Sequence, residues 1–298
     1  MKKFFGISGL ILLAASCSSD ESGNIVDNKS DYAPVTVAVS GFSVNQGDIV
    51  GTRAQTVSDY TKVKFLTLAF YASNGTEVYK HTQNRDDNTT FTTFGDFYTS
   101  LKYGEYTMVV LANGGNNAIT LTSPTLATYG ENIPRDTWAY TQAVNITSND
   151  AMNLSATLSR ICSALAVLST DNRSAEVTHM RFTFSRGAKS FSPTTGLATV
   201  NTGFTVMFGL PDTTLGKTSY TGTYLFLSTT NEETMDVTVE TLDAADGNVL
   251  FSKTVSNVPL KRNRETTLTG AIYSGTGVSA SGFKVNTGWL DPEDPIHF

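Results

Sequence analysis

Apolar and polar residues alternate along most of the chain in short runs. The clearest run covers residues 35–39, where three valines alternate with Thr36 and Ala38. A second apolar run covers residues 63–70, and a polar, glycine-containing loop that holds Arg53 and Ala54 separates the two. Valine, threonine and phenylalanine at a period of two are typical of a pleated, half-buried sheet. The pattern therefore predicts two strands that flank a protease-accessible loop.

Similar runs continue through the first half of the chain, separated by turn-forming residues. We expect strands at residues 77–81, 88–94, 105–112 and 139–146. Asn74-Gly75 favours a hairpin, because both residues tolerate positive φ. Residues 113–135 hold several glycines and two prolines. They predict a long connection with room for a short helix or a binding loop.

The second half shows the same spacing of apolar runs. Residues 154–170 predict a strand pair or one bent strand, and further strands are expected at residues 176–184, 205–208, 223–228, 235–242, 249–255 and 266–273. The run at 161–168 also fits a helix by periodicity, but the neighbouring β signals favour a strand. Asp246-Gly247 favours another hairpin turn. A last run covers residues 283–289, before an acidic, proline-containing tail at 291–298.

Strands at this spacing, without long helical patterns, predict an all-β fold of antiparallel sandwiches. The 298 residues exceed a usual single domain, so we expect two, at residues 32–150 and 151–298. The halves share a strand count but no repeat at the residue level. Any duplication is therefore expected to be one of fold.

The N-terminus has the features of a secretory signal. Residues 1–16 contain two lysines, an apolar stretch and small residues before Cys17, and they are too short to span a membrane. The ending at Cys17 resembles a bacterial lipobox, so we expect acylation of this cysteine, with chains such as palmitate, and firm anchoring. An ordinary signal peptide is the alternative. Residues 17–31 are polar and predict a flexible tether.

The net charge argues against nucleic acid as a partner, and the cysteine count argues against an internal disulfide. The formal net charge is −6, and loss of Lys2 and Lys3 with the signal leaves 19 basic residues against 27 acidic ones, or −8. Nucleic acid is an unsuitable partner, because binding it requires a basic face. With Cys17 at the processing site, Cys162 stands alone, so the mature chain has no internal disulfide.

Candidate chemistry is sparse, and we expect no enzyme, no metal site and no cofactor. His81, His179 and His297 are widely spaced and lack metal-ligand spacing with Cys162. Acidic pairs such as Glu232-Glu233 fall in expected turns, where solvated carboxylates are the rule. The sequence therefore offers no catalytic residues.

The tryptophans allow two interpretations. Trp138 and Trp289, with the many tyrosines, could form a platform on which sugars stack. The favoured interpretation is that these rings fill sandwich cores and sheet faces.

Three short motifs carry a family resemblance. They are Gly51-Thr52-Arg53-Ala54 before a β run, Leu158-Ser159-Arg160, and the segment 258–263 leading to 269–273. Together they resemble the fimbrillin superfamily of Bacteroidetes. Residues 18–21 also resemble the acidic signal that sends lipoproteins of these bacteria to the outer face of the outer membrane.

The resemblance implies two transthyretin-like sandwich domains in tandem, export as a lipoprotein, and a surface location in a fimbrium after processing. It implies a trypsin-like cut between Arg53 and Ala54, and loss of a first strand that carries Val35, Val37 and Val39. Strand exchange then joins the subunits, with residues 283–289 and the tail to Phe298 as the candidate donor. The expected partners are other fimbrial subunits, the outer membrane through Cys17, and receptors or glycans on host or bacterial surfaces.

Alternatives remain open. An anchor subunit would keep its lipid and first strand and hold the base of a fimbrium. A surface glycan-binding lipoprotein is the alternative from another class, and an enzyme ranks last.

Overall fold

A computed structural model describes residues 31–44, 53–57, 60–130, 134–273 and 284–289. This part of the chain is all-β, as predicted, and contains no α-helix. Its helical elements are two 3-10 turns, Asn88–Thr90 and Asp212–Thr214.

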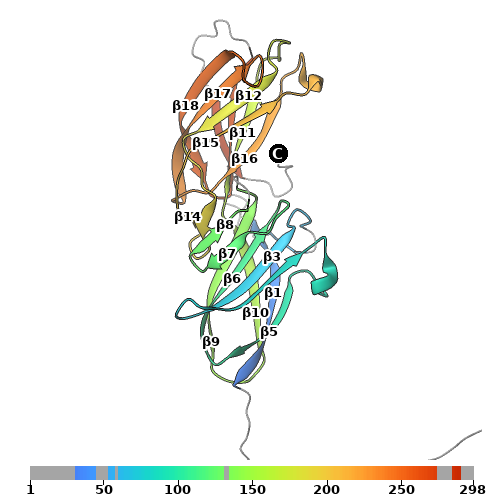
Figure 1. Ribbon diagram of the computed structural model, residues 1–298, viewed down its shortest axis with the longest axis vertical. Helices are drawn as coiled ribbons and strands as arrows, with labels where there is room; N and C mark the ends of the chain where they lie inside the picture. Colours follow the sequence, from blue (N-terminus) through green and yellow to red (C-terminus); the bar gives the residue numbers. More distant parts are fainter. Residues whose placement is uncertain (1–30, 45–52, 58–59, 131–133, 274–283, 290–298) are drawn as a thin grey trace, which may run out of the picture. The chain divides into compact units, whose positions relative to one another are not determined.

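The first half forms one eight-stranded sheet (Figure 1). Its strands follow the order β2-β1-β10-β9-β6-β3-β4, and β5 also pairs with β1. Between β9 and β10 the ladder joins only Ser159 to Ala139 and Arg160 to Trp138, where the sheet changes layers. Side chains of β1, β5 and β10 pack against those of β3, β6 and β9 in one core. The bounds are β1 (Tyr32–Val44), β2 (Arg53–Gln55), β3 (Phe65–Ala72), β4 (Glu77–Asn84), β5 (Asp96–Lys102), β6 (Gly104–Asn113), β9 (Thr137–Ile146) and β10 (Met152–Arg160).

The second half contains two four-stranded sheets, β16-β11-β19-β20 and β15-β12-β17-β18. A second core lies between them and is rich in phenylalanine, including Phe182, Phe184 and Phe226. The bounds are β11 (Ser163–Ser169), β12 (His179–Phe184), β15 (Phe204–Gly209), β16 (Tyr220–Phe226), β17 (Glu232–Leu242), β18 (Val249–Lys261), β19 (Arg264–Gly270) and β20 (Lys284–Trp289).

The strand order repeats between the halves. The first strand of each half pairs in parallel with a strand near the end of that half, β1 with β10 and β11 with β19. Each first strand also pairs antiparallel with a later strand, β5 or β16. The second layer of each half also has the same strand order, which is β4-β3-β6-β9 in the first half and β15-β12-β17-β18 in the second. The duplication is one of strand order, without a repeat in the residues.

A small sheet, β14-β13-β8-β7, combines strands of both halves. With the outer face of β3 and β6 it encloses a third cluster of apolar side chains, which includes Tyr71, Leu111 and Phe191. Strand β3 is therefore buried on both faces, which explains its continuous apolar run. The bounds are β7 (Thr120–Ser123), β8 (Leu126–Thr128), β13 (Ser190–Ser192) and β14 (Leu197–Ala198).

Most predicted strands are confirmed, but the expectations for residues 88–94 and 113–135 were wrong. Residues 88–94 form no strand: the Asp87 side chain accepts a hydrogen bond from the Thr89 amide at 3.2 Å and starts a 3-10 turn, and the strand begins only at Asp96. The connection 113–135 carries β7 and β8 in its described part, where we had expected a helix or binding loop.

The predicted division at residues 150 and 151 falls just before β10. That strand pairs with β1 and β9 of the first sheet, so the second half opens on β11. The chain from Asp31 onward forms one compact unit, and its division into two domains stays a prediction.

Candidate functional site

Strand β1 runs along the middle of the first sheet with neighbours on both sides (Figure 1). Its Tyr32–Ala38 part pairs antiparallel with β5, and residues 35–43 pair in parallel with β10. The N–H of Val39 also donates to the Gly95 carbonyl at 2.9 Å, just before β5 begins. Because both edges are used, removing β1 would open a gap between β5 and β10.

The predicted first-strand residues lie in the core. Val35, Val37 and Val39 are 1%, 0% and 6% exposed, and Ala33 lies on the same face. This alternation is what a strand with one buried face requires. The gap left by β1 would therefore be apolar as well as rich in unpaired backbone groups.

A β-bulge between Val39 and Gly41 changes the phase of this alternation. The Ser40 hydroxyl at the bulge donates to the Ala156 carbonyl of β10 at 3.2 Å. After the bulge Phe42 points inward, where its ring lies 5.4 Å from Tyr60 and 5.2 Å from Trp138 between centroids. Phe42 is the largest side chain that β1 places in the core.

A buried ion pair lies behind these rings. Arg160 holds Asp136 with Nε–Oδ1 and Nη2–Oδ2 distances of 2.8 and 2.9 Å. Its Nη2 also donates to the Tyr60 hydroxyl at 3.1 Å, and its guanidinium lies 4.8 Å from the centre of the Trp138 ring. The Cys162 thiol donates to Asp136 Oδ1 at 3.2 Å.

The surroundings fix the protonation of this cluster. Burial lowers the pKa of Arg160, but the neighbouring Asp136 carboxylate raises it above its usual value. Burial, and then Asp136, raise the pKa values of Tyr60 and Cys162. The cluster therefore contains a permanent cation and neutral Tyr60 and Cys162.

Arg53 and Ala54 lie on strand β2, and not in the loop that the sequence predicts. In the antiparallel ladder their backbones face Val44 and Ser43 of β1. The reason is that β1 continues past its bulge to Val44. Residues 53–55 can therefore pair antiparallel with the end of β1. Strand β2 has no neighbour on its other side among the described strands.

Other predicted residues lie apart from this site or outside the described part of the chain. Cys17 and His297 lie outside the described residues. The candidate donor segment forms β20, which pairs antiparallel with β19 and is a terminal strand of its sheet. His81 and His179 lie on β4 and β12, and the described residues contain no cluster of histidine, cysteine or carboxylate that could hold a metal ion.

Trp138 is 2% exposed, so the interpretation of this ring as a sugar-stacking platform was wrong. The favoured interpretation, that the ring fills the core, is confirmed. Sequence reasoning missed Tyr60, Asp136 and Arg160 as a unit. The available signal was an arginine next to the apolar run that begins at Ile161. Such an arginine can be buried only with an anionic partner. Within the described residues, no helix has the length and apolar character that crossing a membrane requires.

A family model described as a family of unknown function, DUF6562, matches residues 33–292. No curated protein matches the chain.

Solved structures of bacterial surface proteins share the fold. A protein described as a putative adhesin from Bacteroides ovatus has 11% identity and a TM-score of 0.53, over 88% of this chain and 97% of that one. One of the "putative polysaccharide binding proteins (DUF1812)" of Bacteroides thetaiotaomicron has 12% identity and a TM-score of 0.51, over 88% and 100%. The fimbrial anchor protein Mfa2 of Porphyromonas gingivalis has 14% identity and a TM-score of 0.50, over 87% and 98%.

Proposed function

Because the chain belongs to this family, DUF6562, and shares its fold with an anchor protein of fimbriae, we propose that it is a structural subunit of a cell-surface fimbrium. In this proposal two transthyretin-like sandwich domains are exported as a lipoprotein with acylated Cys17. A cut after Arg53 then separates β1 from the folded remainder, and a strand from a neighbouring subunit takes its place.

The observation that carries the proposal is the position of β1. It is the first described strand, it lies between β5 and β10, and its only covalent link to the rest of the fold runs through Arg53. A single cut there would detach both the tether and a central strand. The remaining gap would offer backbone hydrogen bonds and an apolar trough, as strand addition requires.

The energetics favour exchange over simple loss. Val35, Val37, Val39 and Phe42 each contribute about 1.5–3 kcal/mol when buried, or roughly 6–12 kcal/mol together, as an upper estimate. A cut fragment would therefore stay in place until another strand replaces it. The terminal strand β20, with residues 283–298, is our candidate for the replacement.

Treatment of the purified protein with an arginine-specific protease tests the proposal. Lys29 is the only other basic residue between Cys17 and Arg53, so this segment has one site for that protease. We expect a new N-terminus at Ala54, followed by concentration-dependent oligomers in size-exclusion chromatography with light scattering. The Arg53→Ala variant should stay uncut there and monomeric. Oligomers of equal size from this variant would overturn the proposal.

An uncleaved anchor is the second candidate, favoured by the likeness to the fimbrial anchor protein. It would keep Cys17, its lipid and β1 in the assembled fibre. The N-terminus of protein recovered from the bacterial surface separates the two candidates, since a stalk subunit begins at Ala54 and an anchor begins at acylated Cys17.

A further inference from the structure

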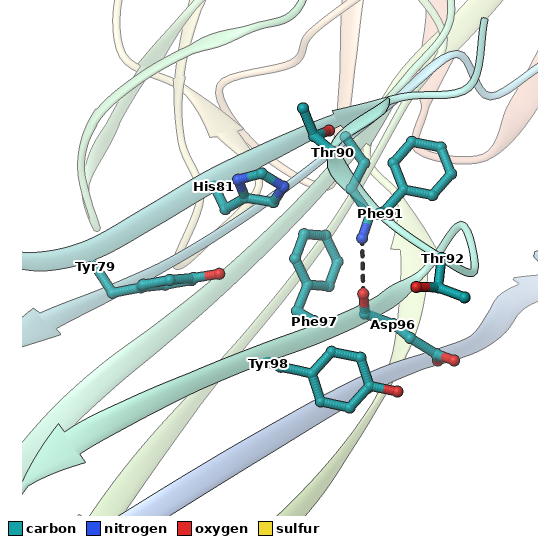
Figure 2. A pocket seen from close by; sticks show the side chains of 9 residues that line it. Tyr79, His81, Thr90, Phe91, Thr92, Asp96, Phe97 and Tyr98 are labelled. Carbon is teal, nitrogen blue, oxygen red and sulfur yellow. Dashed lines mark hydrogen bonds between the residues drawn. The ribbon is translucent and has the colours of Figure 1, made fainter. Parts of the chain in front are cut away.

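A pocket of about 310 Å³ opens between β4 and β5 (Figure 2). These strands belong to the two layers that enclose the first core, and each has one edge without a partner strand among the described residues. Figure 2 shows the Phe97 ring between His81 and Tyr98, with the Tyr79 ring beside them. The volume is at the lower end of the range for small-molecule sites. The lining residues are Tyr79, His81, Gln83, Thr90, Phe91, Thr92, Asp96, Phe97 and Tyr98.

The polar groups on this pocket are available to a ligand. The described structure assigns no hydrogen-bond partner to the Tyr79 hydroxyl, the His81 ring nitrogens, the Asp96 carboxylate or the Tyr98 hydroxyl. Burial raises the pKa of Tyr79, so its hydroxyl keeps its proton. The site thus combines hydrogen-bond donors and acceptors with aromatic faces.

The strands that carry these side chains are tied to each other. The Gln83 amide on β4 donates from Nε2 to the Asp96 carbonyl at 2.7 Å, which is the dashed line in Figure 2. Its Oε1 accepts from the Gly95 amide, also at 2.7 Å. Gly95 has φ +105°, a conformation that favours glycine. The floor of the pocket is therefore held in place before any ligand binds.

The far wall is also anchored. Phe91 packs on Phe94 with ring centroids 5.6 Å apart, and the Arg85 guanidinium lies 4.1 Å from the Phe94 ring centre. Arg85 in turn donates to the carbonyls of Val63 and Val57, each at 2.7 Å. The connection from β4 to β5 is thus fixed to the body of the fold.

Charge selects the class of ligand. The lining contains no lysine or arginine, and Asp96 is its only carboxylate. Phosphates, sialic acids and uronic acids would meet the Asp96 carboxylate with no lysine or arginine in the lining to offset the repulsion. A single cation would use Asp96 but would leave the hydroxyls of Tyr79, Tyr98 and the two threonines without partners. A polyhydroxylated, uncharged ligand uses all of these groups.

We propose that this pocket binds one uncharged pyranose unit of a polysaccharide. Tyr98, which is 67% exposed, offers its ring to the apolar face of the sugar. The Asp96 carboxylate accepts hydrogen bonds from sugar hydroxyl groups, which are stronger than those to a neutral acceptor. The β5 residues of the pocket, Asp96 to Tyr98, pair with residues 36–38 of β1, so binding is measured on the uncut chain, in which β1 is in place.

The test uses the purified full chain on an array of uncharged and anionic oligosaccharides, followed by titration calorimetry with the strongest binder. We expect binding to uncharged sugars, and about a tenfold or larger loss of affinity in Tyr98→Ala and in Asp96→Asn. Tyr98→Phe, which keeps the ring, should lose less. Tyr103→Ala removes another exposed tyrosine, at the turn between β5 and β6, and should bind as the unaltered chain does.

Thermal melting of each variant separates loss of the site from loss of the fold. Absence of binding to every uncharged sugar, equal affinity in Tyr98→Ala, or stronger binding to the anionic than to the uncharged oligosaccharides would each overturn the inference. Because oligomers after protease treatment are measured independently, either proposal can fail while the other stands.

Discussion

The ring of Phe42 on β1 lies against that of Trp138 on β9, with centroids 5.2 Å apart and an interplanar angle of 54°. Trp138 in turn meets Tyr60 edge to face at 5.2 Å. A strand that we propose to be exchangeable is thus held by rings from segments that stay with the protein after a cut. Retention of β1 should therefore depend strongly on this one aromatic contact.

Phe42→Ala should lower the free energy of unfolding by about 3–5 kcal/mol, because it leaves a cavity between Tyr60 and Trp138. Urea denaturation followed by tryptophan fluorescence measures this loss. As a matched control, Phe91→Ala truncates a half-buried ring away from β1 and should cost less. Equal losses in the two variants would contradict the anchoring role of Phe42.

Asp136→Asn should destabilise the chain by about 3–5 kcal/mol, because it leaves the Arg160 guanidinium buried without its anion. The control is Glu240→Gln, which breaks the partly exposed pair of Arg181 and Glu240 and should cost no more than about 1 kcal/mol. Chemical denaturation at neutral pH compares the two. A loss below about 1 kcal/mol for Asp136→Asn would show that the buried pair is dispensable.

Tyr71→Phe should raise stability by about 1 kcal/mol, because the Tyr71 hydroxyl is buried without a hydrogen-bond partner in the described structure. Burial also raises the pKa of Tyr71 to about 12, from an ordinary value near 10. Between these values the unfolded chain loses this proton while the folded chain keeps it, so stability falls as pH rises. Denaturation midpoints at pH 7 and pH 11.5 should show a smaller fall in Tyr71→Phe, and an unchanged fall would contradict the assignment.

A peptide of residues 283–298 should displace the β1 fragment from protein cut after Arg53, and should not displace β1 from uncut protein. The reason is that the uncut strand competes intramolecularly, at high effective concentration. Release of a fluorescently labelled β1 fragment gives the rate. The same peptide with Val285→Asp should be much weaker, and equal release by both peptides would rule out a specific donor.

The period-two pattern was sufficient to predict most strands, because a strand with one face packed on a core must alternate apolar and polar residues. It failed at residues 88–94, where the Asp87 side chain satisfies local amides and competes with strand pairing. It also gave no sign of β13 and β14, which are three and two residues long and pair with β8 across the two halves. Such short, nonlocal pairings depend on tertiary contacts that no local window contains.

For the candidate site, sequence reasoning identified the strand that carries Val35, Val37 and Val39. It could not place Phe42, since the bulge at Ser40 breaks the periodicity on which the reasoning depends. The partners Asp136 and Arg160 are 24 residues apart, and only the register between β9 and β10 brings them together. The pocket between β4 and β5 likewise depends on β5 (Asp96–Lys102), whereas the sequence pattern predicts a strand at residues 88–94.

The repeated strand order has one asymmetric consequence. Strand β11 holds the same place in the second half as β1 does in the first, but only Ile161 and Cys162 separate it from β10. Hence β11 has no free end and cannot leave its sheet without unravelling both halves. Under the proposed strand exchange, each molecule therefore offers a single vacancy, and a filament grown in this way would be unbranched.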